Sequence, residues 1–178
     1  IMIARGDLGI EVSIECIPGI QRQIIRKCIQ AKKPVIVATQ MLHTMINNPR
    51  HTRAEVTDIA NAIYYRTNAL MLSGETDSGT YPIEAVKTMA AIAEQAEKDK
   101  SRENDIEPSP DFTNPREFLA HAAVDATYKL GVKGILTDSE SGATARMLAS
   151  FRGTTPIIAI CYKEKTPRLL HLSYGLIP

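Results

Sequence analysis

The residues of this chain best suited to chemistry stand where short apolar runs end. The runs are residues 1–4, 35–41 and 69–72. The polar residues at or just after their ends are Asp7, Thr39, Ser73 and Glu75. One polar residue at the end of a strand is ordinary, and a short motif alone is weak evidence of function. Three such ends that meet in one place would favour a shared ligand site over three separate helix caps.

The first of these ends carries the segment Arg5-Gly6-Asp7-Leu8-Gly9. Gly6 and Gly9 allow the backbone to turn tightly and to approach a ligand closely. Asp7 offers a hard oxygen ligand that suits Mg²⁺. It could equally cap a short helix, because Asp is a favoured N-cap residue. Arg5 either pairs with Asp7 or faces a neighbouring element, and the sequence leaves both interpretations open.

The elements that must position these residues follow a repeated pattern. Each apolar run is typical of a strand buried on both faces, and each is followed by helical periodicity. The helix signals are an amphipathic stripe over residues 17–30, a capping box from Thr52 to Glu55, and Pro82 at a first turn. This alternation predicts an α/β fold with neighbouring parallel strands. The carboxyl ends of such strands share one edge, where α/β proteins bind ligands.

Residues 101–114 are polar and rich in acidic residues and proline, which indicates a linker. We therefore expect one domain over residues 1–100 and a second α/β domain over residues 115–178. Asn114 and Pro115 are typical of a helix start. We expect the buried side of that helix to hold Phe118, Leu119, Ala122, Ala126 and Leu130. A polar loop that opens the next helix is a candidate anion site, with Thr137, Ser139, Ser141 and Thr144.

Composition excludes several classes of protein. The 178 residues are 44% apolar and 23% charged, and the net charge of +1 gives no argument for binding nucleic acid or an anionic membrane. The cysteines Cys16, Cys28 and Cys161 are odd in number and form no CxxC pair, so we expect a reducing, cytoplasmic compartment. No run is long enough to span a membrane. The chain has no initiator Met and ends without a polar tail, so we expect an internal fragment.

Four segments, in this order, resemble the pyruvate kinase family: residues 3–9 (IARGDLG), 33–42 (KPVIVATQML), 49–55 (PRHTRAE) and 71–76 (MLSGET). Their order, spacing and identity are together highly specific, and the resemblance covers the whole chain. It implies that the first domain is similar to the last three β/α units of a (β/α)₈ TIM barrel. The part after the linker resembles the start of the family's C-terminal α/β domain, which has a mainly parallel sheet.

The resemblance also implies a reaction. Phosphoenolpyruvate gives its phosphoryl group to ADP, forming ATP, and the enolate that remains is protonated to pyruvate. The family's cofactors are Mg²⁺ (or Mn²⁺) and K⁺, and the K⁺ site would lie outside this chain. The resemblance further implies a glycolytic, cytoplasmic enzyme that is a homotetramer at full length and binds neither nucleic acid nor a membrane.

Residue roles carry over from the resemblance position by position. Asp7 is implied as the metal ligand, and the backbone at Arg5 and Gly6 helps Asp7 to hold the substrate. Thr39 is implied to contact the substrate near the carbon that is protonated. The proton path behind it contains Ser73 and Glu75. The loop with Thr137, Ser139, Ser141 and Thr144 aligns with the family's effector loop, although Asp138 and Glu140 within it argue against a sugar bisphosphate.

Two alternatives remain. The chain could be a binding or regulatory module without chemistry, which would need no convergence of Asp7, Thr39 and Ser73. It could also belong to another phosphoenolpyruvate-type barrel, such as a Mg²⁺ lyase, which the second α/β domain disfavours. The family's catalytic Lys and its second acidic metal ligand have no counterpart in these residues. We therefore expect the 178 residues alone to be inactive.

Overall fold

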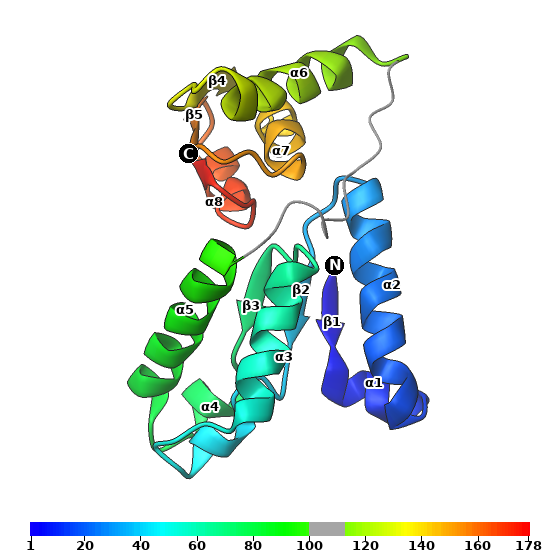
Figure 1. Ribbon diagram of the computed structural model, residues 1–178, viewed down its shortest axis with the longest axis vertical. Coiled ribbons are helices and arrows are strands. Elements are labelled where there is room, and N and C mark those ends of the chain that lie inside the picture. Colours follow the sequence, from blue (N-terminus) through cyan, green and yellow to red (C-terminus); the bar gives the residue numbers. More distant parts are fainter. Residues whose placement is uncertain (100–112) are drawn as a thin grey trace. The chain divides into compact units, whose positions relative to one another are not determined.

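The chain forms two compact units in the computed structural model, which describes residues 1–99 and 113–178 (Figure 1). Each unit contains a three-stranded, wholly parallel sheet, with strand order β1-β2-β3 in one and β4-β5-β6 in the other. The predicted α/β class with parallel sheets is confirmed. Most of the predicted linker, residues 101–112, lies outside the described residues. No helix in the described ranges is both long and apolar enough to cross a membrane.

The first unit alternates strands and helices along the chain. Its elements are β1 (Met2–Ala4), α1 (Arg5–Glu11), η1 (Ile14–Cys16), α2 (Ile17–Gln30), β2 (Ile36–Ala38), η2 (His43–Ile46), α3 (Arg53–Tyr64), β3 (Ala69–Met71), α4 (Gly74–Asp77) and α5 (Pro82–Asp99). The last residues of the three strands, Ala4, Ala38 and Met71, pair in one row across the sheet. The segments that follow the strands therefore begin at the same level.

The core of the first unit is built from side chains of its strands and of the helices between them. Ile3 and Val37 in the strands are buried, as are Ile25 of α2 and Ile59 of α3. Burial of β-branched side chains on a pleated sheet is the main reason these short strands form. Cys28 is buried on α2, whereas Cys16 is exposed at the end of η1.

The predicted capping box of α3 is present in full. Thr52 Oγ1 accepts a hydrogen bond from the Glu55 amide (3.2 Å), and Glu55 Oε2 accepts one from the Thr52 amide (2.7 Å). Glu55 Oε1 also accepts from the Thr44 amide (2.8 Å). The one carboxylate therefore fixes the start of α3 and ties it to η2, next to the segment that follows β2.

Substitution of Glu55 is expected to lower stability in a pH-dependent way. Burial alone raises the pKa of Glu55, but hydrogen bonds from Thr44 and Thr52 outweigh it and hold the pKa below its usual 4.5. A depressed pKa contributes stability that is present above about pH 4.5 and is lost as the pH falls through the lower folded value. Glu55→Gln should cost about 1 kcal/mol at neutral pH.

The measurement is the thermal unfolding temperature of parent and variant from about pH 7 to about pH 3. The difference should shrink as the pH falls. Glu84→Gln, at an exposed site in the first turn of α5, serves as the control. A difference in unfolding temperature that stayed constant across this pH range would contradict the role given to the ionised Glu55 carboxylate.

The second unit contains α6 (Pro115–Lys129), β4 (Ile135–Ser139), α7 (Ala143–Ser150), β5 (Ile157–Cys161), α8 (Lys165–Leu170) and β6 (Leu176–Ile177) (Figure 1). The predicted start of α6 is confirmed, because the side chain of Asn114 accepts from the Arg116 amide (3.1 Å) and Pro115 follows it. The core of the unit gathers around Leu148, Ile157 and Leu170.

The predicted buried side of α6 is wrong. Phe118, Leu119 and Leu130 are 50%, 66% and 76% exposed, whereas Val124 and Thr127 are buried. The reason is close packing against Gly153. A Cβ placed there would lie 3.2 Å from both Val124 and Thr127, so small side chains bring the helix near the core.

Candidate functional site

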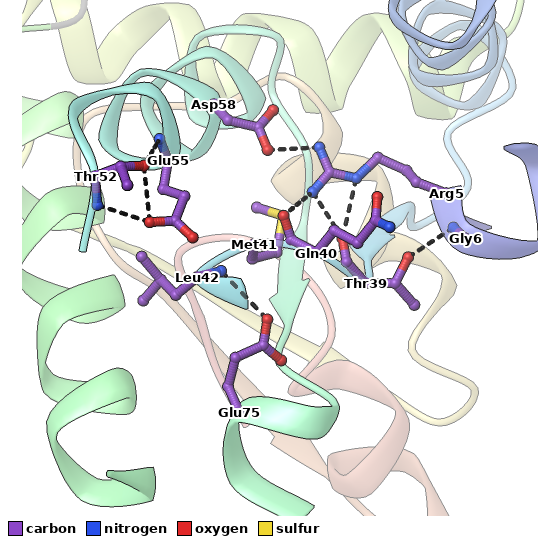
Figure 2. A network of polar contacts seen from close by, with 10 residues as sticks. All are labelled: Arg5, Gly6, Thr39, Gln40, Met41, Leu42, Thr52, Glu55, Asp58 and Glu75. Atoms are coloured by element: carbon purple, nitrogen blue, oxygen red, sulfur yellow. Dashed lines mark hydrogen bonds and ion pairs between the residues drawn. The ribbon is translucent and has the colours of Figure 1, made fainter. Parts of the chain in front are cut away.

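Three strand ends of the first unit lie side by side and carry the candidate site (Figure 2). Arg5 and Gly6 open α1 directly after β1, and Thr39 and Gln40 follow β2. Glu75 lies in α4, two residues beyond Ser73 and close after β3. The segment after β2 connects α1 to α4. Thr39 in this segment contacts Gly6 of α1, and Leu42 contacts Glu75 of α4.

The side chain of Arg5 is buried and binds the backbone of the segment after β2. Its Nε and Nη2 donate to the Thr39 carbonyl oxygen (3.1 and 2.7 Å), and Nη2 also donates to the Gln40 carbonyl oxygen (3.0 Å). Nη1 pairs with Asp58 Oδ2 on α3 at 2.6 Å. Of the two interpretations left open for Arg5, the structure selects a neighbouring element over Asp7. The guanidinium is therefore built into the fold rather than turned toward solvent.

Thr39 and Gln40 have left-handed backbones, with φ of +68° and +56°. Such a conformation costs a non-glycine residue roughly 1–2 kcal/mol, and a β-branched one such as Thr is a genuine outlier. Consecutive residues of this kind persist only where surrounding contacts hold them, and they cluster at functional sites. The backbone geometry independently marks the position after β2 that the sequence singled out through Thr39.

The Gly6 amide donates to Thr39 Oγ1 at 2.9 Å. This hydrogen bond joins the first turn of α1 to the hydroxyl at the end of β2. Gly6 and Gly9 both lie inside α1, so the expectation that they form a tight turn is wrong. The physical reason is that α1 begins directly after β1, with Ala4 as its N-cap residue, and leaves no loop between them.

Asp7 lies in the first turn of α1 and is exposed. The alternative that it caps the helix is wrong, since the N-cap residue is Ala4 and forms no side-chain hydrogen bond. The carboxylate stands in the first turn of a short helix, near the helix end where a negative charge is stabilising. It also borders an open hollow of about 370 Å³ beside β1 that is lined in part by Leu8, Glu11 and Ile24.

These surroundings bear on whether Asp7 could bind Mg²⁺. Within residues 1–99 and 113–178 no three His, Cys, Asp or Glu side chains are grouped to hold a metal ion. Mg²⁺ commonly takes one or two carboxylates and completes its shell with water and substrate oxygens. A single exposed carboxylate is therefore compatible with a partial Mg²⁺ site.

Glu75 is almost fully buried, with 1% of its surface exposed. Its Oε2 accepts a hydrogen bond from the Ser73 amide (2.8 Å), and its Oε1 accepts one from the Leu42 amide (3.3 Å). The carboxylate thus links the start of α4 to the segment after β2. Ser73 beside it is half-buried.

The candidate effector residues of the second unit lie along one stretch. Thr137 and Ser139 belong to β4, and Ser139 is buried. Ser141 is exposed in the loop that follows, and Thr144 is exposed in the first turn of α7. A hydrogen bond and the positive charge of Lys163, 2.6 Å away, hold the pKa of neighbouring Glu140 below its usual value. Next to the hydroxyls, Glu140 is therefore held as a carboxylate in an ion pair with Lys163.

Sequence reasoning missed two members of this site. Nothing in the sequence marks Asp58 as a site residue, because it lies within an ordinary helical segment, one turn after the capping box. Met41, whose Sδ lies 2.9 Å from Arg5 Nη2, reads in the sequence as the end of an apolar strand. Only the folded chain brings either residue to Arg5.

Comparison with known families matches both units. The family described as "Pyruvate kinase, barrel domain" matches residues 1–86, and "Pyruvate kinase, alpha/beta domain" matches residues 117–178.

Curated relatives and a solved structure agree with these matches. A pyruvate kinase of Borreliella burgdorferi is 49% identical over 177 residues, covering 99% of this chain and 37% of that protein. One from Clostridium acetobutylicum is 44% identical over 180 residues, covering 100% of this chain and 38% of that protein. A crystal structure of a pyruvate kinase from Cryptosporidium parvum has a TM-score of 0.91 at 38% identity, covering 98% of this chain and 36% of that one. The chain thus spans little more than a third of the proteins it matches.

Proposed function

Because the chain belongs to the pyruvate kinase family, we propose that it acts within a longer enzyme that transfers the phosphoryl group of phosphoenolpyruvate to ADP. The products are pyruvate and ATP. The main support for this proposal is a hydrogen-bonded cluster at the carboxyl edge of the first sheet. There the Gly6 amide donates to the Thr39 hydroxyl oxygen, and Arg5 donates to the Thr39 carbonyl oxygen.

In this proposal Asp7 supplies a metal ligand on the substrate side of α1. A bound Mg²⁺ would neutralise charge on the transferring phosphoryl oxygens, which is the main requirement of phosphoryl transfer. The backbone at the start of α1, from Arg5 to Asp7, would bind the substrate. Exposure of Asp7 and its place beside an open hollow support this assignment.

Thr39, Ser73 and Glu75 would serve the second half of the reaction, the protonation of the enolate. An enolate needs a positioned proton source, which a hydroxyl or a water chain can supply. The Thr39 oxygen accepts from the Gly6 amide, so its own proton remains available to donate toward the substrate. Ser73 would hold water in the proton path. Because both oxygens of Glu75 bind amides, that residue would support the path by fixing its shape.

For the architecture, we propose that residues 1–100 form the last three β/α units of a TIM barrel and residues 115–178 part of the family's α/β domain, joined by residues 101–114. The three parallel strands in sequence order support the first assignment. The rest of the barrel would supply the catalytic Lys, a second acidic ligand and the K⁺ site. We further propose a cytoplasmic homotetramer, with Mg²⁺ or Mn²⁺ as cofactor.

For regulation, we propose that the stretch from Thr137 to Thr144 is an effector loop that does not bind a sugar bisphosphate. Ser141 and Thr144 are exposed and can donate hydrogen bonds. Asp138 adds an acidic side chain to this stretch beside the Glu140–Lys163 pair, which disfavours a doubly phosphorylated ligand.

The proposed function is tested with a lactate-dehydrogenase-coupled assay on two proteins. The longer enzyme should form pyruvate from phosphoenolpyruvate only when ADP and Mg²⁺ are present. The 178 residues alone should show no turnover above background, because a single ligand for Mg²⁺ without the catalytic Lys cannot bring enough positive charge to the transferring group. Absence of turnover in the longer protein would overturn the proposal. Turnover by the 178 residues at comparable rates would overturn the division of the site between this chain and the rest of the barrel.

A further inference from the structure

We propose that Arg5, anchored by Asp58, is a positioning residue that fixes the Thr39 hydroxyl for proton transfer. The inference rests on the proposed role of Thr39 and assigns a function to two side chains outside the proposed catalytic group. Figure 2 shows the guanidinium between α3 on one side and the segment after β2 on the other.

The first step of the argument concerns the backbone that Arg5 binds. Thr39 and Gln40 are the two residues after β2 with positive φ, and Arg5 donates to the carbonyl oxygens of both. The planar guanidinium presents several N–H groups in a fixed arrangement, which one ammonium group cannot reproduce. Arg5 therefore stabilises this unusual backbone at the residues where it would otherwise relax.

The second step concerns what holds Arg5 itself. Its Nη1 pairs with Asp58 Oδ2 at 2.6 Å, and its Nη2 lies 2.9 Å from Met41 Sδ. Met41 is fully buried, and the Arg5 side chain is 10% exposed. Contacts on several sides leave the guanidinium one position. Arg5 thereby links Asp58 of α3 to the backbone at the end of β2.

The third step concerns the hydroxyl. The backbone of Thr39 determines where Oγ1 lies, and in the observed geometry Oγ1 accepts from the Gly6 amide at 2.9 Å. That hydrogen bond turns the hydroxyl proton away from Gly6 and withdraws electron density from the oxygen. Both effects favour donation of the proton to a neighbouring enolate, and water in the proposed path at Ser73 would return a proton to the Thr39 oxygen. If residues 39 and 40 relaxed to an ordinary backbone, Oγ1 would move away from the Gly6 amide.

The experiment measures deuterium uptake from D₂O into the methyl group of pyruvate by the longer enzyme, which isolates the proton-transfer step. The variants are Thr39→Val, Arg5→Lys and the double variant. Lys retains the positive charge, but one ammonium group cannot contact Asp58 and both carbonyl oxygens in the fixed arrangement of the guanidinium. We expect Thr39→Val to lower exchange roughly 100-fold and Arg5→Lys roughly 10- to 100-fold. The KM for phosphoenolpyruvate should change far less, and Arg5→Lys should add nothing in the Thr39→Val background.

Arg26→Lys, at an exposed position on α2, is the matched control and should exchange like the parent. If Arg5→Lys fails to fold, Asp58→Asn tests the same anchor from the other side and should lower exchange in the same way. Parent-like exchange in the folded Arg5 or Asp58 variants would overturn the inference. The inference would also be overturned if Arg5→Lys lowered exchange by the same factor in the parent and in the Thr39→Val background. Arg5 would then act independently of Thr39. Parent-like exchange in Thr39→Val would instead remove the proposed role of Thr39, and the inference with it.

Discussion

Asp7→Asn in the longer enzyme should lower kcat/KM roughly 100- to 1,000-fold and raise the Mg²⁺ concentration needed for half-maximal rate. Asn keeps the size of the side chain and removes its charge, so it is a much poorer ligand for a hard cation. Because Asp7 is exposed, the variant should fold normally. Only the small interaction with the start of α1 is lost, about 0.3–1 kcal/mol.

The measurement is the initial rate as a function of Mg²⁺ concentration, with phosphoenolpyruvate well below its KM and ADP saturating. Glu11→Gln is the matched control, since Glu11 is an acid at the other end of the same helix and borders the same hollow. Its rate and Mg²⁺ dependence should stay close to those of the parent. An Asp7→Asn enzyme with the parent's Mg²⁺ dependence would rule out Asp7 as a metal ligand.

The second large effect is expected at Glu75. Glu75→Ala removes the acceptor for two backbone amides, Leu42 in a buried place and Ser73 in a half-buried one. Amides left unpaired in such a site each cost about 1–3 kcal/mol, so we expect a local loss of roughly 3 kcal/mol. Glu75→Gln should fall between the parent and Ala, because an amide has one oxygen to accept with and directs its NH₂ group at the other donor.

Hydrogen exchange at the Leu42 and Ser73 amides measures this loss directly. The expected 3 kcal/mol corresponds to exchange that is roughly a hundredfold faster at both positions in Glu75→Ala. Glu84→Ala, exposed on α5, should leave both amides protected. If Leu42 and Ser73 stayed protected in Glu75→Ala, Glu75 would not be the residue that fixes these two segments.

The parallel first sheet was predictable from the sequence because the signals are local. Apolar runs that alternate with helical periodicity leave few arrangements other than parallel strands with crossover helices. The start of α3 was equally predictable, since Thr52 and Glu55 lie within one turn of each other. Such features depend on residues close together in the chain, and the structure contains both.

Contacts between distant residues were beyond sequence reasoning. Arg5 binds carbonyl oxygens 34 and 35 residues away, and a backbone acceptor has no side-chain signature. The left-handed backbone at Thr39 and Gln40 could not be predicted from the sequence either, because neither Thr nor Gln is typical of that conformation. On α6 apolar residues occur on all sides of the helix, so the sequence pattern does not show which side is buried. In the structure, the side that packs against Gly153 is the buried one.

The two left-handed residues after β2 also matter for protein design. A designer who optimised this backbone for stability would place glycine at positions 39 and 40, where it adopts positive φ without steric strain. That choice would delete the Thr39 hydroxyl. Redesign of this scaffold should therefore keep positions 39 and 40 fixed and seek added stability elsewhere, such as on the exposed face of α5.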